Sequence, residues 1–189
     1  MADDKNPSGL ETKEHARLLV ISDSHGNADV VRAILQNFEK TCDALIFCGD
    51  GISDVSSLLS EDFMPPVVAA VRGNCDPLVS ADLSSGFEQT LCVNGHKILI
   101  VHGNAHGVDY GTEKLALKMK FGGYDTAFYG HTHIAAEETA GNFKFVNPGS
   151  CARPRGGQPP SFAIATVEKD FIDIAFLNAS TFSLWTPLS

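Results

Sequence analysis

The sequence predicts an α/β fold in which two sheets pack face to face. Over roughly the first seventy residues, apolar β-prone runs alternate with helically spaced segments, which is typical of a largely parallel sheet with loops at its carboxyl edge. A hairpin follows, and the C-terminal third is rich in short β segments. We therefore expect a single domain over residues 16–189, preceded by a flexible polar tail at residues 1–15.

The alternating part contains three apolar runs that predict buried strands, at residues 17–22, 44–48 and 67–71. Two helices are expected between them, at residues 28–40 and 51–60. The first has apolar side chains at helical spacing, namely Val30, Val31, Ile34, Leu35 and Phe38. Asn27 directly precedes this helix and is expected to be its N-cap.

The second half begins with Asn94-Gly95 between two apolar runs, a strong signal for a type I′ hairpin. Its strands are predicted at residues 87–93 and 97–102. A helix is expected at residues 112–120 and a strand at 126–129. Further short strands are expected at residues 134–139, 143–146, 162–167 and 171–176.

Composition restricts the class of protein. The chain has 189 residues, of which 43% are hydrophobic, and its formal net charge is -9. The acidic balance disfavours duplex nucleic acid, and no apolar run is long enough for a membrane span. Five cysteines without a CxxC pair indicate a reduced, cytoplasmic protein. A small phosphate ester stays compatible, because bound cations would dominate the field inside a site.

Seven side chains of metal-ligand type follow directly after predicted strands: Asp23, His25, Asp50, Asn74, His102, His131 and His133. Such oxygen and nitrogen donors suit Mn²⁺, Fe²⁺, Co²⁺, Ni²⁺ or Zn²⁺. Seven ligands are too many for one catalytic ion with an open position. They are about right for two ions that share a bridging carboxylate.

Asp50 is the natural bridge, because it follows the second strand in the middle of the array. Asp23, His25 and one of the two late histidines would complete one ion, and Asn74, His102 and the other late histidine the second. Two cations on one water would produce a hydroxide that attacks phosphorus. Asp50, Asn74 and His102 are the predicted catalytic residues, and the Asn74 amide could also donate to a phosphoryl oxygen.

The motifs DxH, GD, GN, HG and GHTH occur in this order and are followed by NPGS at residues 147–150. Over roughly residues 17–177 this pattern resembles the calcineurin-like metallophosphoesterases, and more narrowly their small bacterial and archaeal phosphodiesterases. The resemblance implies a four-layer α/β/β/α sandwich of two mixed sheets flanked by helices. It assigns Asp23, His25, Asp50 and His133 to a first ion, and Asp50, Asn74, His102 and His131 to a second. Mn²⁺ is the favoured metal, with Ni, Co, Fe and Zn as alternatives.

Two positions depart from the family pattern. Many relatives have a histidine that protonates the leaving group where this chain has Cys75, and a thiol is a poor general acid. We therefore expect good leaving groups such as phenolates. Asn104 replaces the second histidine of an HGH motif. Asn74, Cys75 and Asn104 are the predicted substrate-binding residues.

The other three histidines and two arginines near the motifs are interpreted as structural residues. His15 lies in the expected tail, His96 follows the hairpin turn and His106 is interpreted as structural. Arg153 and Arg155 lie in a loop rich in proline and glycine, where surface packing is favoured over contact with phosphate.

The leading functional hypothesis is a two-metal phosphodiesterase that hydrolyses small phosphodiesters. One alternative is a catalytically weak protein-binding scaffold, similar to the retromer subunit of this fold. That branch looks altered at the bridging Asp and the GN Asn, whereas this chain keeps Asp50 and Asn74. Another alternative is a phosphomonoesterase or nucleotide pyrophosphatase. No membrane partner is expected, and the sequence leaves a homo-oligomer open.

Overall fold

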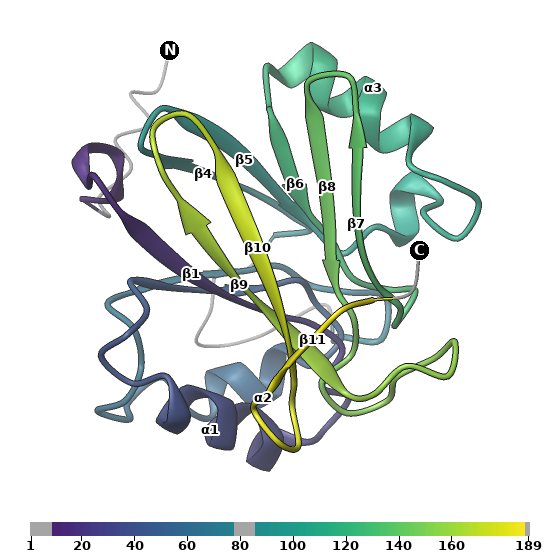
Figure 1. Ribbon diagram of the computed structural model, residues 1–189. Helices are drawn as coiled ribbons and strands as arrows, with labels where there is room; N and C mark the ends of the chain where they lie inside the picture. Colours follow the sequence, from purple (N-terminus) through teal and green to yellow (C-terminus); the bar gives the residue numbers. More distant parts are fainter. Residues whose placement is uncertain (1–8, 78–85, 188–189) are drawn as a thin grey trace.

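Two mixed sheets pack against each other in the computed structural model, which describes residues 9–77 and 86–187. Helices α1 and α2 cover the outer face of one sheet, and α3 lies on the outer side of the other (Figure 1). The predicted α/β/β/α sandwich is therefore confirmed. None of the helices in the described ranges has the length and apolar character that a bilayer crossing requires.

The first sheet has six strands in the order β11-β10-β9-β1-β2-β3. Its parallel half consists of β1 (Ala16–Ile21), β2 (Ala44–Phe47) and β3 (Val67–Ala70). These strands are connected through α1 (Ala28–Asn37) and α2 (Ile52–Ser56). The antiparallel half consists of β9 (Ser161–Val167), β10 (Ile172–Asn178) and β11 (Leu184–Trp185). The alternation of strand and helix thus produces the expected parallel arrangement, and the chain's C-terminal strands extend it.

The second sheet has five strands in the order β4-β5-β6-β8-β7. They are β4 (Glu88–Val93), β5 (His96–Val101), β6 (Thr126–Phe128), β7 (Ala135–Ala140) and β8 (Phe143–Pro148). β5, β6 and β8 run parallel, with α3 (Glu113–Gly122) before β6. Asn94 and Gly95 join β4 to β5 with φ of 49° and 88°, the pair of positive values that a type I′ turn requires.

The apolar core has three parts that follow the layers. Between the sheets lie Val20, Ile46, Ile100, Phe128 and Val146. The space under α1 and α2 is filled by Ile21, Ile34, Phe47 and Phe162. The third part lies under α3 and contains Leu99, Leu115, Met119 and Phe145. Each sheet therefore buries both faces, which explains why the sequence shows continuous apolar runs at its central strands.

Several boundaries differ from the expectations. α1 ends at Asn37 rather than at Lys40, and α2 has only five residues. Two short elements were not predicted, η2 (Asn104–His106) and β11. The tail also differs in part, because Leu10 in η1 (Leu10–Thr12) is buried and its carbonyl accepts from the Asn94 N–H. Residues 1–8 of the predicted tail lie outside the described residues.

Candidate metal centre

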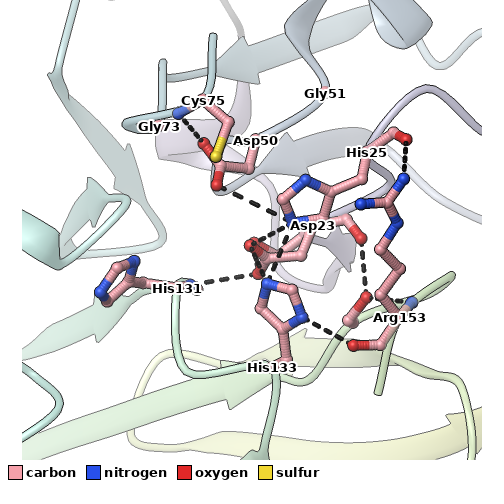
Figure 2. A network of polar contacts seen from close by, with 12 residues as sticks. Asp23, His25, Asp50, Gly51, Gly73, Cys75, His131, His133 and Arg153 are labelled. Atoms are coloured by element: carbon pink, nitrogen blue, oxygen red, sulfur yellow. Dashed lines mark hydrogen bonds and ion pairs between the residues drawn. The ribbon is translucent and has the colours of Figure 1, made fainter. Parts of the chain in front are cut away.

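Strands of both sheets deliver polar side chains to one place (Figure 2). Asp23 follows β1, Asp50 follows β2, His102 follows β5, and His131 and His133 follow β6. Because the carboxyl ends of parallel strands meet at one edge, these short loops converge. Backbone hydrogen bonds tie neighbouring loops together, from Asp23 N–H to the Gly49 carbonyl and from Gly130 N–H to the His102 carbonyl, both at 3.0 Å.

Five of the predicted ligands form a compact cluster around two carboxylates. His133 Nε2 lies 3.3 Å from Asp23 Oδ1, and His102 Nε2 lies 3.4 Å from Asp50 Oδ2. His25 Nε2 is 3.8 Å from an oxygen of each carboxylate. Asp50 thus lies between two imidazoles, which is the position that a shared ligand would occupy.

Two atoms at the centre of the cluster are buried without a hydrogen-bond partner among the described residues, Asp23 Oδ1 and His102 Nε2. Buried polar atoms are normally satisfied, so each such atom needs an explanation. One is a carboxylate oxygen and the other an imidazole nitrogen, which are the ligand atoms that borderline divalent ions prefer. A cation bound at each of these atoms would satisfy it. The residues present therefore fit divalent metal ions.

The second ring nitrogen of two histidines faces a backbone carbonyl. His102 Nδ1 lies 2.7 Å from the Cys48 carbonyl, and His133 Nδ1 lies 2.6 Å from that of Arg153. A carbonyl only accepts, so each Nδ1 carries the proton. In the neutral imidazole this leaves the Nε2 lone pair directed at the carboxylates and available to a metal.

The electrostatics of the metal-free cluster follow from its two carboxylates. Burial lowers the pKa of His102, but the nearby Asp50 carboxylate and the charge of Asp23 outweigh it, so that this pKa lies above 6.5. The Asp23 carboxylate, 3.3 Å away, likewise raises the pKa of His133. Burial lowers the pKa of His25. Burial raises the pKa of Asp50, but His102 and the Cys75 N–H lower it by more. The pKa of Asp50 is therefore below its ordinary value, and the carboxylate is ionised at neutral pH.

The backbone at the cluster is left-handed at five predicted ligands. The φ angles are 57° at Asp23, 46° at His25, 56° at Asp50, 71° at His131 and 61° at His133. Positive φ is uncommon outside glycine, although Asp and His tolerate it better than most residues. Such strain costs on the order of 1–3 kcal/mol for each residue and concentrates at functional sites. The sequence analysis did not predict this feature.

Two further carboxylates hold the loops that carry the cluster. Asp76 accepts four backbone hydrogen bonds of 2.8–2.9 Å, from the N–H groups of Asp50, Gly51, Ile52 and Gly73. Asp54 accepts from the Ser24 hydroxyl and the Gly26 N–H. Carboxylates at such positions are ordinarily expected to be caps, turn acceptors or solvated groups rather than ligands. Their chemistry is indeed that of turn acceptors, but the turns that they hold are those of the candidate ligands.

The NPGS turn supports the cluster from the other side. The Ser150 hydroxyl donates to the Asp23 carbonyl at 2.7 Å. The Asn147 amide donates to the Gly130 carbonyl at 2.8 Å. Both side chains are buried, so this turn fixes the loops of Asp23 and of the GHTH motif relative to each other.

Three predicted site residues lie beside the cluster rather than in it. The His131 ring contacts Asp109, with Nε2 2.8 Å from Oδ2. The backbone N–H of His131 donates to Asp23 Oδ2 at 3.1 Å. Asn74 is exposed, and its amide donates to Cys75 Sγ at 3.3 Å. Asn104 is exposed in η2, away from the hydrogen bonds of the cluster. Asp109 was not among the predicted residues, and its position in a loop gave no signal.

Cys75, a predicted substrate-binding residue, lies next to Asp50. Its N–H donates to Asp50 Oδ1 at 2.8 Å, and its side chain is exposed. A hydrogen bond to Asp50, together with burial and neighbouring charges, raises the pKa of the thiol to about 11. The group is therefore a neutral thiol at physiological pH.

The other histidines are bound elsewhere. His15 pairs with Glu168 at 2.5 Å, His96 with Asp125 at 3.3 Å, and His106 with Glu88 at 3.5 Å. His96 is half-buried rather than exposed. A hollow of about 720 Å³, lined by Phe176 and Trp185 among others, contains none of the predicted ligands.

Comparison with known proteins agrees with this geometry. The model of the calcineurin-like phosphoesterase superfamily domain matches residues 17–170. A probable metallophosphoesterase, YsnB of Bacillus subtilis, is 33% identical over 161 residues, covering 85% of this chain and 90% of that protein. The phosphodiesterase YfcE of Escherichia coli is 29% identical over 181 residues, covering 86% and 92%.

Solved structures share the fold. A conserved uncharacterized protein from Streptococcus pneumoniae has a TM-score of 0.74 at 24% identity, covering 92% of this chain and 94% of its own. Vacuolar Protein Sorting 29 from Cryptosporidium parvum has a TM-score of 0.75 at 16% identity, covering 91% and 95%. At these identities the structures support the architecture alone. The family match over most of the chain, together with the convergent Asp and His donors, shows that this protein belongs to the calcineurin-like phosphoesterase superfamily.

Proposed function

We propose that this phosphoester hydrolase cleaves small phosphodiesters and works with two divalent metal ions. The observation that carries the proposal is the pair of buried, unpartnered donor atoms, Asp23 Oδ1 and His102 Nε2, which cluster with the ionised Asp50 carboxylate within the described residues. The names of the relatives YsnB and YfcE support the same class of reaction.

The proposed ligands divide into two sets that share Asp50. Asp23, His25 and His133 would complete the first ion, and Asn74, His102 and His131 the second. When bound, two cations lower the pKa of a coordinated water and offset charge on a phosphoryl group. Manganese is the favoured metal, with Ni, Co, Fe or Zn as alternatives, because all the donors are nitrogen or oxygen.

This chain's own side chains set the remaining steps. The carbonyls of Cys48 and Arg153 hold His102 and His133 in the tautomer that directs Nε2 into the site. The Asn74 amide is positioned at the exposed rim, where it can donate to a phosphoryl oxygen. The neutral Cys75 thiol, with its pKa of about 11, is a weak proton donor for a departing oxygen. We therefore propose a preference for leaving groups that depart without a proton.

The scaffold alternative has weaker support. Its basis is a likeness of fold to Vacuolar Protein Sorting 29 at low sequence identity, and fold alone does not imply function. All seven predicted ligands are present in this chain, and several of them have a strained backbone conformation.

The five cysteines are all free, which supports a reduced compartment.

The proposal is tested with bis-p-nitrophenyl phosphate and p-nitrophenyl phosphate as substrates. The protein is stripped of metal and reloaded in turn with Mn²⁺, Ni²⁺, Co²⁺, Zn²⁺ or Mg²⁺. We expect metal-dependent cleavage of the diester that exceeds cleavage of the monoester. Asp50→Asn should abolish it, whereas Asp62→Asn, which removes an exposed carboxylate elsewhere, should not.

Two results would count against it. Binding of two ions without turnover of either substrate would favour a scaffold. Preferential cleavage of p-nitrophenyl phosphate would favour a phosphomonoesterase.

A further inference from the structure

A pocket of about 390 Å³ opens directly beside the proposed bridging carboxylate. His25, Asp50 and Cys75 form the wall that it shares with the metal centre, and Arg153 closes it from the NPGS loop. Among the described residues that line it, Arg153 is the only one with a permanent positive charge. A substrate whose phosphoryl group reaches Asp50 would therefore place an adjacent group next to a guanidinium.

The position of Arg153 is fixed at three points. Its N–H donates to the Ser150 hydroxyl at 2.7 Å, and its carbonyl lies 2.6 Å from His133 Nδ1. From this anchored backbone the side chain reaches across to the His25 carbonyl, to which Nη2 donates at 3.3 Å (Figure 2). The guanidinium thus spans the loops of two candidate ligands of the first ion.

The hydrogen bonds of the pocket leave most donors of the Arg153 guanidinium available to an anion, although carboxylates line the pocket as well. Asp76 and Asp54 also line the pocket, but their oxygens already accept four and two hydrogen bonds from the loops. Within the described part of the chain, the Arg153 guanidinium has the single hydrogen bond to the His25 carbonyl and no ion pair. A guanidinium has five donors and matches phosphate oxygens in pairs.

We propose that Arg153 makes this pocket a subsite for a second phosphate, so that the preferred substrates are diesters of the phosphoanhydride class, such as nucleoside diphosphate conjugates. The inference deepens the proposed function and rests on it. It also changes the expectation from the sequence, which favoured surface packing for Arg153 over contact with phosphate.

The chemistry of the leaving group agrees with this class. Water attacks the phosphorus that the proposed metal site would hold beside Asp50, a new P–O bond forms, and the bond from that phosphorus to the bridging oxygen breaks. The bridging oxygen keeps the electron pair and leaves as part of the second phosphate, while the water's protons pass to solvent. A phosphate is a weakly basic anion, with a second pKa near 6, so it departs without a proton donor. Arg153 stabilises its charge by charge-assisted hydrogen bonds.

The experiment compares two diesters with the metal-loaded full-length protein. UDP-glucose presents a phosphoanhydride, whose cleavage to UMP and glucose 1-phosphate is followed by ³¹P NMR. Bis-p-nitrophenyl phosphate presents one phosphate and reports the proposed diesterase activity by itself. For Arg153→Gln we expect kcat/KM on UDP-glucose to fall roughly 10- to 100-fold. On bis-p-nitrophenyl phosphate it should change less than about threefold, and Arg153→Lys should recover part of the loss.

Arg155→Gln is the matched control, because it removes the same charge from the same exposed loop but does not line the pocket. Mn²⁺ affinity, measured by titration calorimetry, shows whether each variant retains the metal centre. A selective loss for Arg153→Gln supports the subsite. Equal losses on both substrates, equal effects of the two arginine variants, or no cleavage of UDP-glucose by a protein active on the other diester would overturn the subsite while leaving the diesterase intact. No cleavage of either diester would overturn both.

Discussion

Asp109 Oδ2 lies 2.8 Å from His131 Nε2 and connects the loop after η2 to the GHTH motif. A carboxylate accepts, so the Nε2 of this imidazole carries the proton and its Nδ1 keeps the free lone pair. Metal-ligating histidines are commonly oriented by such a carboxylate, and its loss reduces metal affinity. The contact therefore fixes the tautomer of His131, and we propose that it also orients this ring for the second ion.

Removing this carboxylate should weaken the binding of the proposed second metal ion. For Asp109→Ala we expect a 10- to 100-fold loss of affinity for one of two ions, in line with other carboxylate–histidine–metal contacts. Titration calorimetry with Mn²⁺ measures it. Asp109→Glu should restore part of the affinity, and Asp173→Asn, an exposed carboxylate on β10, controls for net charge. Tighter binding in Asp109→Ala would show instead that Asp109 competes with the metal for His131.

The Asp76 carboxylate should matter for both folding and metal binding. Asp76→Ala leaves four backbone N–H groups of the ligand loops without their acceptor. We expect the free energy of unfolding, measured by urea denaturation, to fall by about 2–3 kcal/mol, with a parallel loss of Mn²⁺ affinity. Asp62→Ala at an exposed site should change stability by less than about 0.5 kcal/mol. Similar effects of the two substitutions would refute a special role for Asp76.

Cys75→His should widen the range of leaving groups. Imidazolium is a competent general acid, and a positioned acid contributes about 10²- to 10⁴-fold. We expect hydrolysis of an alkyl diester, glycerophosphocholine, to rise at least about tenfold, because an alkoxide is a much poorer leaving group than a phenolate. Hydrolysis of bis-p-nitrophenyl phosphate should change little. Cys75→Ala is the control, and a gain in that variant as well would mean that the thiol merely obstructs the site.

Metal affinity should depend on pH through His102 and His133. Their pKa values lie above 6.5 in the metal-free protein, and each must lose its proton to bind. We expect affinity to fall by about tenfold per pH unit for each displaced proton as the pH drops below these values. Calorimetry in buffers of different ionisation enthalpy counts the released protons. Affinity that stays constant between pH 8 and pH 6 would contradict the assignment.

The same shifts have the opposite sign for the stability of the metal-free fold. A histidine with a raised folded pKa stabilises the native state below the ordinary value of 6.5. This contribution is lost as pH rises through the raised values. Chemical denaturation of the metal-free protein at pH 6 and pH 9 should therefore show a smaller stabilising contribution of His102 and His133 to the free energy of unfolding at pH 9. The difference in this contribution between the two pH values should be smaller in a His133→Asn variant.

Much of the fold could be predicted because its central elements have strong periodicity. The continuous apolar runs of β1 and β2 and the helical spacing in α1 identified these elements to within a few residues. The order of strands could not be predicted, since the β1–β9 pairing joins Leu18 to Ala165 across most of the chain. Elements as short as η2 and β11 contain no full period, and the burial of Leu10 depends on a contact with the distant Asn94.

The candidate ligands could be predicted because each directly follows a strand end. Contacts that orient them could not, because sequence spacing does not reveal them. Asp109 lies 22 residues before His131, and Asp76 lies 26 residues after Asp50. The left-handed backbone at Asp23 and Asp50 also has no sequence signal, because Asp adopts it in ordinary turns as well.

That left-handed backbone has a consequence for how such a protein can evolve. Asn tolerates the same conformation as Asp, so exchanging Asp23 or Asp50 for Asn preserves the loop geometry while removing a negative charge. A single base change suffices for this exchange, since an Asp codon and an Asn codon differ at one position. The strained turns restrict which amino acids these positions accept, so asparagine is a readily reached substitute that keeps the turn and loses the charge.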